Sequence, residues 1–218
     1  MSKQGSDWTR DWAAKRLERD RNVQKVEIVA PQVLRVIGTE EAPFCAATIA
    51  SEQVEPSDFE HLLDEFTEIK FVTNVPKESF WTGQGIRFAE ARSVGWGGFG
   101  DLLKALTLRD PSAYVKNEFE FVERGLIHHT HVSSLERVHD RKYVVKRRGL
   151  PTLTVVIWNE YELTSDHVRT ARERYGAFNA ILITNPNGGP TSSAVGAADS
   201  MGASVYLWGQ FMGRLRKR

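Results

Sequence analysis

Three carboxylates are the strongest candidates for chemistry in this chain: Asp140, Glu160 and Glu162. Glu160 and Glu162 follow an apolar, β-branched run and are two residues apart, a spacing that places both side chains on one face of a continuing strand. Carboxylate oxygens that converge can hold Mg²⁺, which activates water and offsets charge on a scissile phosphate. The pattern predicts a metal site at these three residues, with Glu118 or Glu120 as a further ligand. The alternative is that Glu160 and Glu162 are edge or loop carboxylates near a helix start, where the helix dipole favours negative charge.

A basic run surrounds Asp140, and no other acid interrupts it. Its members are Arg137, Arg141, Lys142, Lys146, Arg147 and Arg148. Dense cationic side chains are typical of phosphate-binding surfaces, so the run predicts binding to DNA or RNA. Trp158 and Tyr161 lie close in sequence and would stack on bases if exposed. The interpretation preferred for Trp158 is packing beneath the helix that follows it.

Charge is divided unevenly along the chain, although the formal net charge is only +1. An acidic run that contains no lysine or arginine lies in the first half: Glu52, Glu55, Asp58, Glu60, Asp64, Glu65 and Glu68. The asymmetry offers a second hypothesis, an accessory subunit whose acidic half docks a basic protein partner. Solvated faces, or two halves that attract each other, would explain it equally well. A third hypothesis is a small-ligand binder that uses the turn TNPNGG at 184–189.

Histidines cluster at His128, His129 and His131, with His139 nearby. On a strand, His129 and His131 would share a face, which suits a transition metal or a phosphate. Surface histidines at the start of a strand are the commoner explanation. The role of this cluster stays open.

Apolar periodicity predicts helices and strands that alternate, and one block of the chain resembles another. Residues 151–215 and 43–106 both read as strand, helix, strand, helix, strand. At an offset of 108 residues, Ile49 meets Ile157, Glu52 meets Glu160, Ser57-Asp58 meets Ser165-Asp166 and Glu65 meets Glu173; after a gap, Thr73-Asn74 meets Thr184-Asn185, and finally Ala89, Gly100 and Leu106 meet Ala198, Gly209 and Leu215. We expect a duplication into two lobes, at 1–110 and 111–218.

The same alignment sets Val54 opposite Glu162, so the first lobe lacks the second carboxylate of the predicted site. It is therefore expected to be an acidic, inactive copy. The second, basic lobe is the candidate functional copy.

Bulk composition indicates a soluble globular protein: 218 residues, 41% hydrophobic and 26% charged. Cys45 is the only cysteine, so no intrachain disulfide can form and a reducing, cytoplasmic home is expected. No apolar stretch approaches the roughly 20 residues that span a bilayer, and the polar N-terminus does not resemble a secretory signal.

The lobe order, a helix, two strands and then strand, helix, strand, helix, strand, resembles the core of restriction-endonuclease-like nucleases of the Mrr-like branch, most clearly over 143–215. The resemblance implies an α/β fold with a mixed sheet flanked by helices. It also implies an acid on one strand and an acid-x-lysine or acid-x-acid pair on the next, here Asp140 with Glu160 and Glu162. No lysine follows at the second position of that pair. The expected function is a nucleic-acid-associated protein, either a weak Mg²⁺-dependent nuclease or a catalytically silent descendant.

Overall fold

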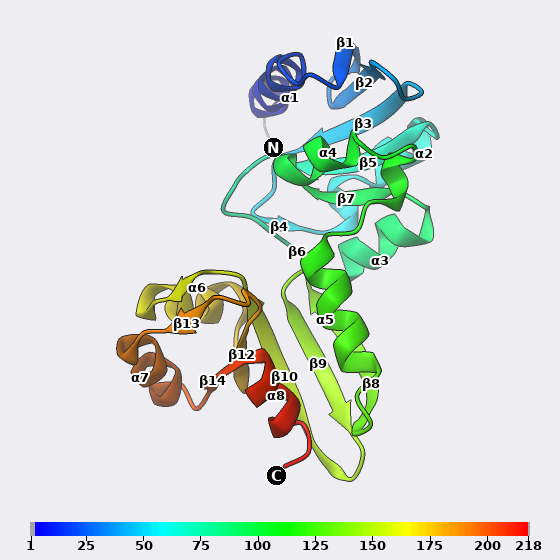
Figure 1. The fold of residues 1–218 in the computed structure, drawn as a ribbon. Coiled ribbons are helices and arrows are strands. Elements are labelled where there is room, and N and C mark those ends of the chain that lie inside the picture. The colour runs from blue at the N-terminus through cyan, green and yellow to red at the C-terminus, as the bar shows by residue number, and fades with distance from the viewer. Residues whose placement is uncertain (1–2, 218) are drawn as a thin grey trace. The chain divides into compact units, whose positions relative to one another are not determined.

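The computed structural model describes residues 3–217 and divides the chain into two compact units, Met1–Lys116 and Asn117–Arg218. The division falls a few residues beyond the boundary expected at residue 110. Each unit has its own five-stranded sheet with helices packed around it (Figure 1). The prediction of an α/β chain with two mixed, helix-flanked sheets is confirmed.

The first unit begins with a helix and a three-stranded antiparallel meander and then alternates strands with helices. Its elements are α1 (Lys3–Leu17), β1 (Val23–Ala30), β2 (Val33–Gly38), β3 (Phe44–Ile49), β4 (Gln53–Val54), the 3₁₀ turn η1 (Pro56–Asp58), α2 (Glu60–Glu65), β5 (Ile69–Asn74), β6 (Phe80–Trp81), α3 (Gly83–Ala91), β7 (Gly95–Gly98), α4 (Phe99–Ala105) and the 3₁₀ turn η2 (Pro111–Ala113).

The second unit repeats the same order. Its elements are α5 (Asn117–Ile127), β8 (Val132–His139), β9 (Lys142–Arg147), β10 (Leu150–Trp158), β11 (Glu162–Leu163), α6 (Ser165–Tyr175), β12 (Ala180–Ile183), β13 (Gly189–Pro190), α7 (Ser192–Ser200), β14 (Ser204–Leu207) and α8 (Trp208–Arg214).

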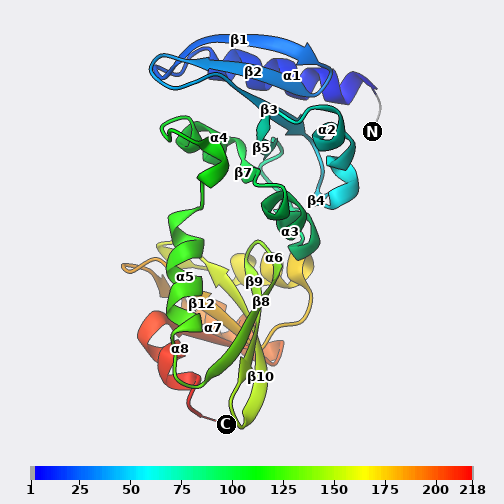
Figure 2. The ribbon, with the colours of Figure 1, turned by 90° about the vertical axis from the view of Figure 1, so that its right-hand side faces the viewer.

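The two sheets have equivalent strand orders, β1-β2-β3-β5-β7 and β8-β9-β10-β12-β14 (Figure 2). In each, the first three strands pair antiparallel and the last two join in parallel after helical crossovers. Each unit also has a small parallel ladder, β4 with β6 and β11 with β13. The first sheet is buried on both faces: α1 and α4 cover Leu34, Val36 and Ala46, whereas Val33, Cys45 and Ala47 belong to the opposite core.

The structural repeat has a constant spacing of 109 residues. Val23–Ala30 recurs as Val132–His139, Gly83–Ala91 as Ser192–Ser200, and Phe99–Ala105 as Trp208–Arg214. Irregular features recur at the same spacing: β1 is bulged between Ile28 and Ala30, and β8 between Arg137 and His139. The left-handed residue after the third helix is Ser93 in the first unit (φ 56°) and Gly202 in the second (φ 71°). Two units that share bulges and helix ends, as well as topology, form a gapless structural repeat.

One polar contact shows how closely the local chemistry recurs. Thr82 caps α3, accepting from Gly85 N at 3.1 Å and donating to Val54 O at 2.9 Å. Thr191 caps α7 in the same way, accepting from Ala194 N at 3.1 Å and donating to Leu163 O at 3.1 Å. Such a cap satisfies backbone donors that the first helical turn leaves unpaired.

Most of the alignment predicted at an offset of 108 is therefore wrong by one residue. Ile49 O accepts from Val75 N and Trp158 O accepts from Thr184 N, so Ile49 corresponds to Trp158, and Ile157 corresponds to Thr48. The pairing of Thr73-Asn74 with Thr184-Asn185 is also wrong. The three later pairs, such as Ala89 with Ala198, have the observed spacing. Few residues are identical between the two units at the true spacing of 109. Chance identities at a spacing of 108 are therefore enough to favour the wrong alignment.

Candidate functional site

A buried polar cluster lies in the second unit where α5, the β8–β9 turn and the end of β12 meet. It consists of Glu118, Asp140, Arg141, Lys142, Tyr175 and Thr184. Arg141 Nη1 lies 3.1 Å from Glu118 Oε1, and Thr184 Oγ1 donates to the same oxygen at 2.7 Å. Only 5% of the Glu118 side chain is exposed, and Glu118 Oε2 is buried without a hydrogen-bond partner. The ion pair between Arg141 and Glu118 is therefore the centre of the cluster.

Asp140 and Lys142 attach the cluster to α6. Asp140 Oδ1 accepts from Arg141 N at 2.9 Å and from Tyr175 Oη at 3.2 Å, and Lys142 Nζ donates to Tyr175 O. Arg141 lies in the β8–β9 turn and contacts Glu118 of α5, whereas Lys142 begins β9 and contacts Tyr175 of α6. The β8–β9 turn thereby connects α5 with α6.

The electrostatics of the cluster favour the charged form of Arg141 and the neutral form of Tyr175. Burial alone would lower the pKa of Arg141, but Glu118, Asp140 and Tyr175 outweigh it and raise that pKa. Burial, and then Arg172, lowers the pKa of Lys142. Burial, followed by the charge of Asp140, raises the pKa of Tyr175, so its hydroxyl keeps the proton that it donates to Asp140.

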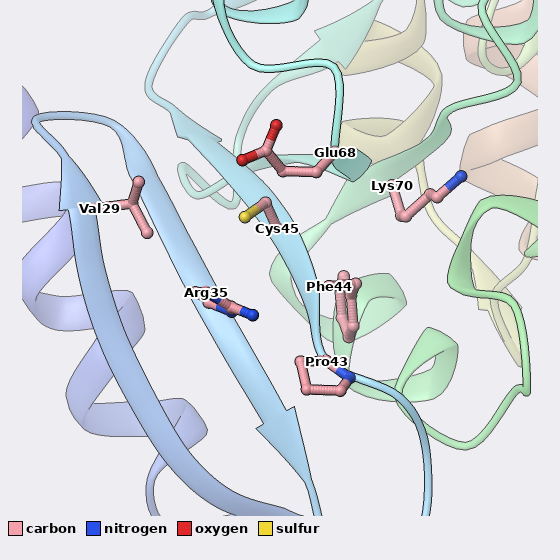
Figure 3. Close-up of a pocket in the computed structure, with 7 residues that line it drawn as sticks. All are labelled: Val29, Arg35, Pro43, Phe44, Cys45, Glu68 and Lys70. Carbon is pink, nitrogen blue, oxygen red and sulfur yellow. The ribbon is translucent and has the colours of Figure 1, made fainter.

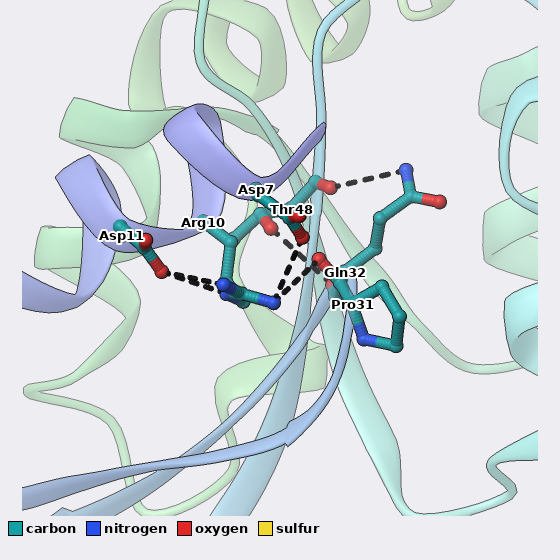
Figure 4. Close-up of polar contacts among 6 residues, drawn as sticks. All are labelled: Asp7, Arg10, Asp11, Pro31, Gln32 and Thr48. Atoms are coloured by element: carbon teal, nitrogen blue, oxygen red, sulfur yellow. Dashed lines mark hydrogen bonds and ion pairs between the residues drawn. The ribbon is translucent and has the colours of Figure 1, made fainter. Parts of the chain in front are cut away.

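The first unit does not have this cluster. At the 109-residue spacing, Thr9 stands for Glu118, Pro31 for Asp140, Gln32 for Arg141, Val33 for Lys142, Phe66 for Tyr175 and Val75 for Thr184. Gln32 and Thr48 exchange hydrogen bonds between side chain and backbone at 3.3 and 3.4 Å, and Arg10 reaches the backbone oxygen of Pro31 at 3.5 Å (Figure 4). The fold therefore forms without a buried charge at this position.

The carboxylate pair predicted on one strand is not on one strand. β10 ends at Trp158, Glu160 lies in the following loop, and Glu162 begins the separate strand β11; both side chains are exposed. The chain leaves the main sheet here because β11 pairs with β13, so strand alternation does not relate the two carboxylates. A Cβ at Gly188 would lie 2.5 Å from Glu160 O, so the turn after β12 packs on the backbone of this loop.

The three predicted catalytic carboxylates do not form a metal-binding group. Within residues 3–217 no group of three or more histidine, cysteine, aspartate or glutamate side chains is arranged to hold a metal ion. At the 109-residue spacing Glu160 corresponds to Ser51 and Glu162 to Gln53, whereas Val54 corresponds to Leu163. The predicted pairing of Val54 with Glu162 is therefore wrong, although Gln53, which takes that place, is not a carboxylate either.

Four of the six residues predicted to contact nucleic acid point into the second unit. Arg141 and Lys142 belong to the buried polar cluster. Arg137 pairs with Glu123 at 2.8 Å and donates to Tyr143 Oη, and Arg147 is 5% exposed. The basic run does not form one surface, because a strand directs consecutive residues to opposite faces. Lys146 and Arg148 are exposed.

Arg147 holds the end of the chain against β9. Its guanidinium donates to Pro151 O at 2.7 Å, Lys217 O at 2.6 Å and Arg214 O at 3.2 Å. Five donors in a planar fork allow arginine to satisfy several carbonyls at once. Burial, followed by the charge of Arg214, lowers the pKa of Arg147.

Five basic residues lie beside Arg147 on the chain or at the segment that it holds, and they are here called the basic end: Lys146, Arg148, Arg214, Arg216 and Lys217. Arg214 is half-buried and the other four are exposed. No basic residue occupies the corresponding positions of the first unit, which are Ile37, Thr39, Ala105, Thr107 and Leu108. The basic run at 137–148 and the basic residues Arg214, Arg216 and Lys217 are both visible in the sequence, but only the contacts of Arg147 show that the two segments lie side by side.

The histidine cluster borders the basic end and is not on a strand. α5 ends at Ile127 and β8 begins at Val132, so His128, His129 and His131 lie in the turn between them. The rings of His129 and His131 are 5.8 Å apart, and His131 O accepts from Arg148 N at 2.8 Å. Burial, then Arg216 and His131, lowers the pKa of His129.

The acidic run of the first unit is partly structural. Glu55 and Asp58 form the capping box that begins η1, and Asp58 also accepts from Ser51 Oγ at 2.8 Å. Asp64 lies 3.5 Å from Arg92. These contacts account for three of its seven acids without a partner protein.

Within residues 3–217, fold and site define a tandem α/β protein whose second unit has a buried ion-pair cluster and a basic end that the first unit lacks. Comparisons with protein-family models, curated proteins and solved structures found no match for this chain. Among the helices described, none is long and apolar enough to cross a membrane.

Proposed function

We propose that the chain is a nucleic-acid-binding protein that contacts DNA or RNA through the basic end of its second unit. One observation carries the proposal: buried Arg147 fixes the C-terminal residues beside the end of β9, which brings Arg214, Arg216 and Lys217 near Arg148 and, on the other face of the strand, Lys146. Clustered cations bind a phosphate backbone by displacing its condensed counterions, a mechanism that needs no sequence preference.

The proposal predicts a salt-dependent affinity that falls when the exposed cations are removed. Replacing Lys146 and Arg148 by alanine should weaken binding to a duplex and flatten the slope of log K against log salt by about 0.9 for each phosphate that the variant no longer neutralises. Fluorescence anisotropy over a series of salt concentrations measures both the affinity and the slope. Arg169→Ala, which removes an exposed cation of α6 outside the basic end, is the matched control and should change neither. Equal slopes for the double variant and the wild type would contradict the proposal.

We propose further that the second unit is a catalytically silent descendant of a duplicated restriction-endonuclease-like fold. The order of a helix, an antiparallel meander and parallel strands with helical crossovers supports the resemblance. Silence is supported by the buried polar cluster, where the guanidinium of Arg141 supplies the positive charge beside Glu118 and Asp140. A reducing, cytoplasmic compartment is part of the proposal, since Cys45 is a buried free thiol.

If the second unit is catalytically silent, the protein should not cleave single- or double-stranded DNA or RNA in the presence of Mg²⁺ or Mn²⁺. Glu160→Gln should leave stability within about 0.5 kcal/mol of the wild type, because Glu160 is exposed in a loop. Gel assays with each metal, and thermal unfolding of the variant, test the two expectations. Metal-dependent cleavage that Glu160→Gln abolishes would restore the nuclease hypothesis.

A further inference from the structure

The first unit has a charged pocket on the face of its sheet opposite α1. Its lining residues are Val29, Arg35, Pro43, Phe44, Cys45, Glu68 and Lys70. Arg35 and Cys45 are paired neighbours on β2 and β3, and they alternate with Leu34, Val36 and Ala46, which face α1 and α4. The pocket volume is about 280 Å³, close to the lower limit for small-molecule sites.

The charged groups of the pocket keep hydrogen-bonding capacity for a ligand, although Arg35 faces Glu27 across β1 and β2 and the two charges act on each other. Within the described residues, the side chains of Arg35, Glu68 and Lys70 form no hydrogen bond or ion pair. At the 109-residue spacing the second unit has Val144 for Arg35, Ala177 for Glu68 and Asn179 for Lys70. The second sheet forms with neutral residues at all three positions, so the charges are specific to the first unit.

The pocket offers opposite charges on either side of a neutral floor. Figure 3 shows Cys45 between Glu68 and Arg35. Burial raises the pKa of the Cys45 thiol, with Glu68 raising it further and Arg35 opposing, so the floor stays uncharged. Arg35 and Glu68 are too far apart to form an ion pair, yet both act on the same thiol. A ligand with two opposite charges fits between them.

Apolar surface borders the same charges. Val29 is 44% exposed on β1, and Pro43 lines the other side. A fork of guanidinium donors binds a carboxylate well, and a carboxylate accepts from an ammonium group. We propose that this pocket binds a small zwitterion of the amino-acid type, with its carboxylate on Arg35, its ammonium on Glu68 and an apolar side chain against Val29 and Pro43.

The test uses the full chain and three matched probes. L-Leucine has both charges, isocaproate is leucine without the ammonium, and isoamylamine is leucine without the carboxylate. We expect leucine to shift NMR signals of the pocket on titration, and each single-charge probe to bind at least about tenfold more weakly, a difference of about 1.4 kcal/mol. Absence of leucine binding would overturn the proposal, and so would isocaproate binding as tightly as leucine.

Variants assign the two charges. Arg35→Gln and Glu68→Gln should each weaken leucine binding by at least about tenfold, whereas Lys104→Gln, an exposed cation on α4 outside the pocket, should leave it unchanged. Unaltered leucine affinity in Glu68→Gln would overturn the zwitterion assignment. Neither pocket variant should affect nucleic-acid binding, so this proposal and the proposed function fail independently.

Discussion

Replacing Arg147 by lysine should weaken nucleic-acid binding by roughly tenfold, although Arg147 is buried and its charge is kept. Lysine lacks the planar fork, so it cannot serve Pro151 O, Arg214 O and Lys217 O together. Carbonyls left unpaired should also cost about 1–3 kcal/mol of folding free energy. Affinity measured by anisotropy at fixed salt, together with chemical denaturation, gives both quantities.

The neighbouring residue supplies the control for this effect. Arg148→Lys makes the same chemical change at an exposed position, and it should leave affinity and stability close to those of the wild type. If Arg147→Lys binds as tightly as the wild type while folded, Arg147 does not organise the basic end. Circular dichroism at the assay temperature establishes that the variant is folded.

Replacing Arg141 by glutamine should be among the most destabilising single changes in the second unit. It leaves the carboxylate of Glu118, with 5% of its side chain exposed, without its cation. Removing one partner of a buried ion pair costs about 3–5 kcal/mol. Denaturant unfolding of the full chain measures the decrease, which belongs to the transition of the second unit if the two units unfold separately.

The sequence of the first unit suggests a second substitution that should restore the stability lost in Arg141→Gln. Glu118→Thr combined with Arg141→Gln installs the pair found at Thr9 and Gln32, where the same fold forms without charge. The double variant should be more stable than Arg141→Gln alone, because the uncompensated carboxylate is gone; couplings between residues in contact reach about 0.5–3 kcal/mol. A double variant less stable than either single variant would show that the cluster is not a substitutable ion pair.

The order of elements could be predicted from the sequence because it depends on local periodicity. Phe59, Leu62 and Leu63 recur at helical spacing and are buried beneath the first sheet, and the apolar runs around Ala47 and Val156 form the central strands. The repeat was also detectable, but its spacing was not. Few residues are identical between the units, and the shared features are bulges, caps and left-handed turns that depend on backbone geometry.

The buried polar cluster and the basic end could not be predicted. They depend on the direction of side chains on β9, on where β10 ends and on contacts with the C-terminal residues. Lys146 and Arg147 are adjacent, yet one is exposed and the other is buried, as strand alternation requires once the start of β9 is known. The apolar run continues almost to Glu160 and Glu162, which favours one strand for both; β10 nevertheless ends at Trp158, where pairing with β12 ends. Contacts between residues 70 positions apart in the sequence, such as Arg147 with Lys217, have no local signal.

Hydrogen–deuterium exchange of the full chain, with and without a single-stranded oligonucleotide at low salt, tests the basic end most directly. We expect slower exchange in peptides covering 143–149 and 209–217, and in the histidine turn at 128–131, with no change in peptides of the first unit. The protection should disappear at high salt, since counterion competition weakens phosphate contacts. Protection confined to the first unit, or no protection in a complex shown by anisotropy to have formed, would contradict binding through the basic end.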